Sequence, residues 1–368
     1  MNSSVLPPRA ELQSRLENFR GIMRRRGINS ALITNEQNVR YLSGFTGADS
    51  ALLILQHRKF LLTDFRFIEE AHRTAQGWRL ILKPRGLIEK AGAAVKRKRL
   101  RKLAVEAGDM RVGEIKALRK FARGVRVRPE DAMVAELRFA KSPWEVRQIE
   151  NALRVQEACF LQFCKSLRRG ISERDAAAEL RYLMTRSGAD DESFQCMVQI
   201  ANHSSLPHGR PTHRRLSGDA VILVDWGAKV NGYHSDLTRT FFIGRIPPKL
   251  RHIHGIVLEA QRQAIERIAP GVEFSDVDKA ARKVIAKAGY GKAFGHSTGH
   301  GIGLDVHEAP SLSTRAKGAL QPGMIVTVEP GIYLPGIGGV RIEDDVLVTE
   351  KGHRVLSTIG KGLRWNGD

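Results

Sequence analysis

Residues 221–236 of this 368-residue chain read VILVDWGAKVNGYHSD, an apolar run that ends in a carboxylate and leads through a turn to a second carboxylate. The run 221–224 is typical of a buried strand, where an unpartnered charge such as Asp225 would be costly. Asn231-Gly232 favours a tight hairpin turn, so Asp236 on the returning strand should lie beside Asp225. The stretch therefore predicts a hairpin that carries two adjacent aspartates.

A second stretch repeats this arrangement. Residues 324–331 read MIVTVEPG, and VRIE at 340–343 returns after a glycine-rich turn at 336–339, so Glu329 and Glu343 add two more carboxylates. Four converging carboxylates repel one another and suit one or two hard divalent cations. His300, within HSTGHGIG at 296–303, would complete such a set, because the glycines allow close backbone approach. Taken singly, each residue has an ordinary structural interpretation; together the five favour a metal centre.

The surrounding sequence repeats the order helix, helix, strand pair. We expect helices at 143–167 and 172–187 before strands at 220–226 and 232–242, then helices at 248–269 and 275–288 before strands at 324–329 and 340–348. Capping boxes are expected at Ser142 with Glu145, Ser172 with Asp175, and Ser275 with Asp278. This part of the chain predicts an α+β domain with pseudo-two-fold organisation.

The N-terminal part alternates strands and helices and predicts an α/β domain. Its expected helices are 11–26, 66–75, 86–97 and 114–122, and its expected strands are 31–34, 51–55, 60–63, 79–83 and 102–106. Pro129 is expected to open a linker helix over 129–142. Because domains average about 150 residues, we expect two, at 1–138 and 139–368.

The charge is strongly basic, with 60 Lys and Arg against 39 Asp and Glu, a net +21. Residues 1–138 hold 29 basic and 14 acidic residues, so +15 of the excess lies there. Its densest run, KRKRLRK at 96–102, lacks interleaved aromatics, a helix-turn-helix and a zinc pattern, so we expect no nucleic-acid partner. A non-enzymatic protein that binds nucleic acid or an acidic partner through this part is the alternative hypothesis.

Other sequence features indicate the location of the protein and the state of its cysteines. No apolar run reaches the roughly 18 residues of a membrane span and the start is too polar for a signal peptide, so we expect a soluble, cytoplasmic chain with no membrane partner. Cys159, Cys164 and Cys196 have no CxxC spacing, so we expect reduced, packed thiols.

The motifs resemble those of the pita-bread metallopeptidases, the family of methionine aminopeptidase, aminopeptidase P and proline dipeptidase. The resemblance rests on LPHG at 206–209, DWGA at 225–228, GYHSDLTRT at 232–240, HSTGHGIG at 296–303, VHE at 306–308, EPG at 329–331 and RIED at 341–344. The first domain resembles that of creatinase, aminopeptidase P and prolidase through NVRYLSGF at 38–45 and LTDFR at 62–66. The resemblance implies a creatinase-like domain followed by a pita-bread catalytic domain.

The resemblance also implies a ligand set. Asp236 and Glu343 would bridge two divalent metal ions, with Asp225 completing one site and His300 and Glu329 the other. Manganese is the first expectation, with cobalt, zinc or iron as alternatives, since carboxylate-rich sites accept several metals. Relatives further imply a homodimer.

The implied activity is hydrolysis of the N-terminal Xaa-Pro bond of short peptides by a metal-bridging hydroxide. Glu329 would accept the proton, His296 and His307 would hydrogen-bond the substrate carbonyl and the oxyanion, and His208 would order the leaving side. Arg341 is expected to hold Glu343. His296, four residues before His300, follows the proline-peptidase pattern; a methionine or broad-specificity aminopeptidase is the alternative.

The preferred peptide length is left open by the motifs. Arg315 stands roughly where prolidases place an arginine for the C-terminal carboxylate of a dipeptide, but an exposed loop residue is an equally ordinary interpretation. Gln199 departs from the run that relatives have in this region, which affects the expected shape of the pocket.

Overall fold

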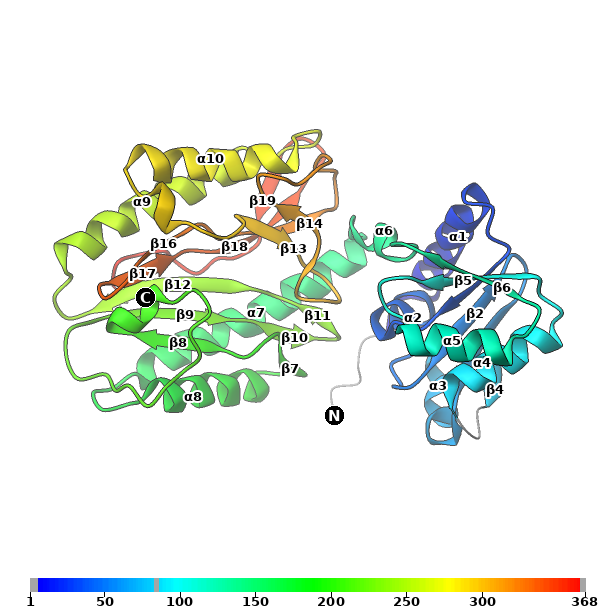
Figure 1. Cartoon of the computed structure of the whole chain (residues 1–368). Helices are drawn as coiled ribbons and strands as arrows, with labels where there is room; N and C mark the ends of the chain where they lie inside the picture. Colours follow the sequence, from blue (N-terminus) through cyan, green and yellow to red (C-terminus); the bar gives the residue numbers. More distant parts are fainter. Residues whose placement is uncertain (1–5, 83–85, 365–368) are drawn as a thin grey trace. The chain divides into compact units, whose positions relative to one another are not determined.

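The computed structural model describes residues 6–82 and 86–364. Its internal contacts divide the chain into two compact units, and the division falls between Arg138 and Phe139. Figure 1 shows the N-terminal unit in blue to cyan and the C-terminal unit in green to red. The described chain contains no helix that is both long and apolar enough to cross a bilayer.

The N-terminal unit is built on one six-stranded mixed sheet in the order β4-β3-β2-β1-β5-β6. Its strands are β1 (Ser30–Ile33), β2 (Ala51–Leu55), β3 (Lys59–Thr63), β4 (Arg79–Leu82), β5 (Lys102–Glu106) and β6 (Arg126–Glu130). The central strands are apolar on both faces, as expected for a sheet covered by helices on both sides. The predicted end of the fourth strand, Lys83, lies outside the described residues.

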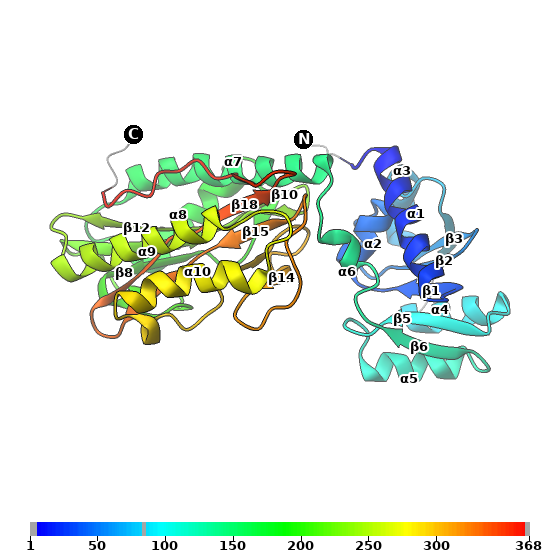
Figure 2. The ribbon, with the colours of Figure 1, turned by 90° about the horizontal axis from the view of Figure 1, so that it is seen from above.

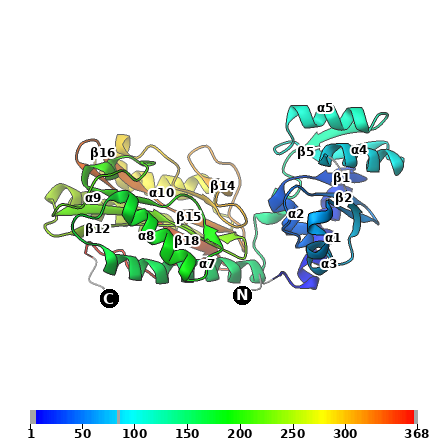
Figure 3. The same ribbon diagram turned by 90° about the horizontal axis from the view of Figure 1, so that it is seen from below.

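Helices cover both faces of this sheet. Figures 2 and 3 show α4 and α5 on one face and α1, α2 and α3 on the other. The six helices are α1 (Arg9–Arg25), α2 (Glu36–Ser43), α3 (Ile68–Thr74), α4 (Leu87–Arg97), α5 (Val112–Phe121) and the short α6 (Ala135–Arg138). Leucine and valine side chains of β1, β2, β3 and β5 pack against α4 and α5 to form one core.

Two elements of this unit differ from the sequence prediction. Pro129 does not open a linker helix; it lies in β6 opposite Val105, at the edge of the sheet. A proline is tolerated there because an edge strand need not donate on its outer side. The sequence interpretation also missed α2, although Asn35 caps its first turn by accepting from the Asn38 amide and Gly44 ends it with φ 75°.

The C-terminal unit has two pairs of long helices against its strands. Figure 1 shows α9 and α10 (yellow) along one edge of the strands and α8 (green) along the other. The helices are α7 (Pro143–Ser166), α8 (Glu173–Arg186), α9 (Pro248–Glu266) and α10 (Phe274–Lys287). Ser142 and Glu145 form the predicted capping box of α7. Ser172 caps α8 by accepting from the Asp175 amide, but the carboxylate of Asp175 accepts from the Ser172 hydroxyl, so the predicted box is only half formed.

The strands form four groups, and two antiparallel pairs position the site. β9 (Ala220–Trp226) pairs with β12 (Leu237–Ile243) and β8 (Met197–Ile200), and β15 (Ile325–Val328) pairs with β18 (Asp344–Val348). The remaining strands are β7 (Asp191–Glu192), β10 (Ala228–Val230), β11 (Tyr233–His234), β13 (Gly299–Gly301), β14 (Glu308–Leu312), β16 (Gly331–Leu334), β17 (Gly338–Arg341) and β19 (His353–Val355). The turn between β10 and β11 is the predicted one, with Asn231 and Gly232 both at positive φ.

The two halves hold their site strands in a similar way. Gln156 on α7 donates to the carbonyl of Trp226 at the end of β9, and Gln261 on α9 donates to the carbonyl of Val328 at 3.2 Å, at the end of β15. A buried glutamine on a long helix thus satisfies the last carbonyl of the strand in each half, which fixes the residues that follow.

Two local predictions in this unit were wrong. The expected strand 340–348 is broken, because β17 pairs with β16 and β18 pairs with β15, which leaves Glu343 at the crossover between two sheets. The expected capping box of Ser275 with Asp278 does not form: α10 begins at Phe274, and Asp278 is fully buried and accepts from Thr298.

Candidate metal centre

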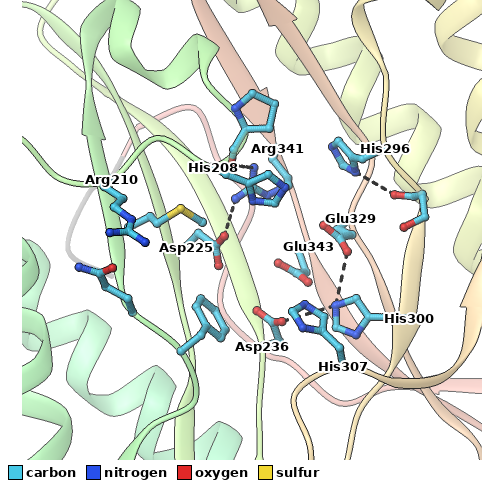
Figure 4. A pocket seen from close by; sticks show the side chains of 15 residues that line it. His208, Arg210, Asp225, Asp236, His296, His300, His307, Glu329, Arg341 and Glu343 are labelled. Atoms are coloured by element: carbon cyan, nitrogen blue, oxygen red, sulfur yellow. Dashed lines mark hydrogen bonds and ion pairs between the residues drawn. The ribbon is translucent and has the colours of Figure 1, made fainter. Parts of the chain in front are cut away.

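A cavity of about 460 Å³ lies in the C-terminal unit over the ends of β9 and β15. Figure 4 shows carboxylates and histidines pointing into it from both halves of the unit. Its lining residues are Phe194, Gln195, Met197, Pro207, His208, Arg210, Asp225, Asp236, His296, Ser297, His300, His307, Glu329, Arg341 and Glu343. All five residues expected to hold metal are among them.

The register of the strands brings the carboxylates together. Asp225 lies opposite Thr238 in the β9–β12 ladder, so Asp236 is close by at the entry to β12. Glu329 follows β15, and the amide of Glu343 donates to the carbonyl of Thr238 at 3.1 Å, which ties the two halves together. One ligand atom from each of Asp236, His300 and Glu343 lies within 4.8 Å of the others.

The chemistry of this cluster fits a divalent cation. Oδ1 of Asp225 and Oδ1 of Asp236 are buried and have no hydrogen-bond partner among the described residues. Burial, followed by the neighbouring carboxylates, raises the pKa of Asp236 and of Glu343 well above the ordinary values. Orphaned oxygens in a buried set of like charges need protons or cations, and oxygen donors are what hard divalent ions prefer.

The location and the pKa of Glu329 both matter for proton transfer. Its Oε1 lies 3.6 Å from Nε2 of His300, and its side chain is 17% exposed. Burial raises its pKa to about 7, with the charge of Arg341 opposing the shift and that of Asp225 adding to it. A carboxyl group with this pKa exchanges protons near neutral pH.

His300 is oriented toward the carboxylates by its own strand. Its Nδ1 lies 3.0 Å from the carbonyl of Gly301, which leaves Nε2 at 3.7 Å from Asp236. Burial lowers the pKa of His300 to about 4, so the ring is neutral at pH 7, the form that binds metals. Gly299 is required here, because a Cβ at that position would lie 1.9 Å from the carbonyl oxygen of Thr327.

Arg341 does not hold Glu343 as the sequence analysis expected. Its Nη2 lies 2.5 Å from Oδ2 of Asp225, and its Nε donates to the hydroxyl of Thr238 at 3.0 Å. That hydroxyl in turn donates to Oε2 of Glu343 at 2.7 Å. The guanidinium therefore pairs directly with Asp225 and reaches Glu343 only through Thr238.

His296 lies in the cavity with both ring nitrogens engaged. Nδ1 is 2.8 Å from the carbonyl of Ser297, and Nε2 is 2.9 Å from the hydroxyl of Tyr333. Burial lowers the pKa of His296 to about 4 and raises that of Tyr333 to about 12, so a neutral ring accepts from a protonated phenol at pH 7. The expected donation from His296 to substrate would require this contact to break.

The other predicted site residues fall inside and outside the cavity. His208 and His307 line it, and the ring of His307 packs edge-on at 4.4 Å from that of His300. Arg315 is exposed in the segment after β14 and is not among the lining residues. The structure therefore brings every predicted site residue together except Arg315.

Several supporting residues escaped the sequence interpretation. Tyr333 joins His296 to Arg341, whose Nη1 donates to its hydroxyl at 2.9 Å. Asp278 accepts from the amide and hydroxyl of Thr298, at 3.2 and 2.8 Å, and pairs with Arg282 at 2.6 Å. Asp278 thereby anchors the segment between the two histidines to α10. Its position four residues before Arg282 on a helix was the available signal.

Comparisons with known sequences place two conserved regions on this chain. The profile described as metallopeptidase family M24 matches residues 147–350, and that described as creatinase/prolidase N-terminal domain matches residues 15–140. The uncharacterised peptidase YqhT of Bacillus subtilis is 38% identical over 349 residues, which cover 95% of this chain and 99% of that protein.

Solved structures agree with these matches over nearly the whole chain. The Xaa-Pro dipeptidase from Bacillus anthracis is 37% identical, covers 96% of this chain and 99% of its own, and superposes with a TM-score of 0.93. The X-Pro aminopeptidase from Thermotoga maritima is 33% identical, covers 94% of this chain and 99% of its own, and superposes with a TM-score of 0.87.

Proposed function

Because the chain belongs to metallopeptidase family M24 and carries a creatinase/prolidase N-terminal domain, we propose that it hydrolyses the N-terminal Xaa-Pro bond of short peptides. The resemblance and the two-part fold predicted from the sequence are confirmed by these matches and by the solved structures. The observation that carries the proposal is the convergence of four carboxylates and His300 in one cavity, in a chain whose relatives include an Xaa-Pro dipeptidase.

We further propose that the cavity holds two divalent cations. Asp236 and Glu343 would bridge them, Asp225 would complete one site, and His300 and Glu329 would complete the other. When bound, such ions supply Lewis acidity that polarises a carbonyl and lowers the pKa of water. Manganese is our first candidate, and cobalt, zinc and iron are the alternatives.

The residues of the chain supply orientation and proton transfer. Glu329, whose Oε1 lies 3.6 Å from Nε2 of His300, would accept a proton from the attacking water and pass it to the leaving nitrogen. His208 and His307 would contact the substrate from the exposed side of the cavity, and His307 would hydrogen-bond the oxyanion. His296 would position the carbonyl once its contact with Tyr333 breaks, and Arg341 keeps Asp225 in place through their ion pair.

Cleavage assays on the full chain test this proposal. Protein loaded with Mn²⁺, Co²⁺ or Zn²⁺ is incubated with Leu-Pro, Leu-Pro-Ala and Met-Ala, and the products are identified by mass. Release of leucine from either proline peptide, in preference to methionine from Met-Ala, is expected. Preferential cleavage of Met-Ala would favour the methionine or broad-specificity aminopeptidase instead, and no cleavage with any of the metals would refute a peptidase.

The resemblance also leads us to propose a homodimer that acts in the cytoplasm. Light scattering on the purified protein tests the first statement, and fractionation of cells tests the second. A monomer at micromolar concentration, or recovery outside the cytoplasm, would contradict them.

A further inference from the structure

One arginine of the cavity has no carboxylate partner. The cavity is lined by two arginines, and Arg341 is buried and paired with Asp225. Arg210 is exposed, and among the residues that the structure describes none accepts a hydrogen bond from its side chain or forms an ion pair with it. Figure 4 shows it on the Asp225 side of the cavity, across the carboxylates from His300.

The backbone that carries Arg210 is held on both sides. Gln199 is a fully buried residue of β8. Its side-chain Nε2 donates to the carbonyl of Leu206 at 2.7 Å and to the carbonyl of Gly209 at 3.1 Å. Glycine at position 209 allows the Gln199 side chain to come this close, since a Cβ there would lie 2.4 Å from Nε2 of Gln199. These two hydrogen bonds from the Gln199 side chain, which an apolar residue could not make, thus fix the segment that precedes Arg210.

A second set of hydrogen bonds holds the backbone just after Arg210. Glu173, fully buried on α8, accepts from the amide and the hydroxyl of Thr212 at 2.8 and 2.6 Å. The same carboxylate accepts from the amide of Ile200 at 2.8 Å. Arg210 therefore projects a side chain without contacts from a backbone that is ordered on both sides, an arrangement that leaves the guanidinium available while limiting the ordering cost of binding.

Charge indicates what this guanidinium would bind. The two divalent cations that we propose would offset the four carboxylates of the cavity, so Arg210 would supply a positive charge beyond those that balance this set. A guanidinium binds a carboxylate through two parallel hydrogen bonds, which gives direction as well as attraction. Gln195 also lines the cavity and offers an amide donor.

We propose that Arg210 is a specificity-determining residue that recognises a carboxylate of the peptide substrate, positioned by Gln199. The inference rests on the proposed peptidase function and adds to it the substrate class. The carboxylate has two possible sources, the side chain of an acidic N-terminal residue or the C-terminus of a dipeptide.

Two pairs of peptides that differ only in one charge distinguish these sources. Glu-Pro-amide against Gln-Pro-amide tests the side chain, and Leu-Pro against Leu-Pro-amide tests the C-terminus. kcat/KM is measured for each with the metal-loaded wild type, Arg210→Gln and Arg210→Lys. Arg214→Gln is the matched control, because Arg214 lies on the same segment, is exposed and does not line the cavity.

The wild type is expected to prefer the charged member of one pair by about tenfold, as a charge-assisted pair typically gives. Arg210→Gln should abolish that preference through KM, Arg210→Lys should restore part of it, and Arg214→Gln should keep it. Equal ratios in wild type and Arg210→Gln, or no preference in the wild type, would overturn the inference while leaving the peptidase function intact. No cleavage of any of the four peptides by the wild type would overturn the proposed function and the inference with it.

Discussion

Nη2 of Arg341 lies 2.5 Å from Oδ2 of Asp225, so one oxygen of an expected metal ligand is already bound to a guanidinium. The other oxygen, Oδ1, is buried without a partner among the described residues. Arg341 thus fixes the direction in which Asp225 presents its free oxygen. Because both side chains are almost wholly buried, solvent screens the pair little.

Replacing Arg341 with methionine should weaken metal binding without removing a ligand. The loss of an outer partner typically lowers metal affinity by about 10-fold to 100-fold, and leaving Asp225 unpaired should cost about 3 kcal/mol of stability. Calorimetric titration with Mn²⁺ and urea unfolding measure the two effects. Arg341→Lys should retain part of both; metal affinity equal to wild type in Arg341→Met would contradict this role.

Asp236→Asn should change the stability of the metal-free and metal-loaded protein in opposite directions. Without metal, the substitution removes a carboxyl group whose ionisation is opposed by burial and by the neighbouring carboxylates, so the melting temperature in EDTA should rise. With excess Mn²⁺, the variant should lose the stabilisation that ligand binding gives, about 2.7 kcal/mol at 100 times Kd. Melting curves in EDTA and in Mn²⁺ measure both.

Activity should follow the same metal dependence. EDTA should inactivate the wild type and added Mn²⁺ should restore it, whereas Asp236→Asn should stay inactive in both conditions. Equal stabilisation of wild type and variant by Mn²⁺ would show that Asp236 does not hold the ion.

His254 should make the protein less stable in mild acid. Burial lowers its pKa to about 4 from an ordinary value of 6.5, so between these pH values the unfolded chain binds a proton that the folded chain does not. The free energy of unfolding is therefore highest above pH 6.5 and decreases as the pH falls toward 4, by on the order of 2 kcal/mol at pH 5. Urea unfolding at pH 7.5 and pH 5 measures it.

His254→Gln isolates this effect, because glutamine does not titrate. The variant should lose less stability between pH 7.5 and pH 5 than the wild type. His252→Gln, on the exposed side of the same helix, is the control and should behave as the wild type. An identical pH dependence in wild type and His254→Gln would exclude His254 as the cause.

Asp278→Asn should destabilise the protein and slow catalysis from a distance. The carboxylate is fully buried and accepts from Thr298 and Arg282, so its loss should cost about 3 kcal/mol and disorder the segment that carries His296 and His300. Asp276→Asn, at a half-buried position of the same helix where the carboxylate pairs with the exposed Lys279, should change little. Urea unfolding and kcat/KM measure both variants; equal behaviour of the two would refute the anchoring role.

The sequence predicted that the candidate ligands would converge because they sit at the ends of strongly patterned strands, and they do line one cavity. Asp225 follows an uninterrupted apolar run, Glu329 follows one interrupted only by Thr327, and Asn231-Gly232 determines the turn that brings Asp236 back. These are local signals, and the long helices were found for the same reason.

The failures concern contacts that sequence spacing does not encode. Arg341 is two residues from Glu343, which suggested a shared face, but the chain changes sheets between them and the guanidinium meets Asp225 from the other half. Asp278 looked like a capping residue because its partner, Thr298, is distant in the sequence. Pro129 indicated a helix start, whereas an edge position in the sheet tolerates it equally well.

The division of the ligands between the two halves of the C-terminal unit has a consequence for synthesis of the protein. Asp225 and Asp236 come from the first half, and His300, Glu329 and Glu343 come from the second. A nascent chain on the ribosome therefore cannot assemble the centre until the crossover at Glu343 has emerged and both halves have docked. Binding of the proposed metal ions by all five residues would thus be a late event in the formation of the fold.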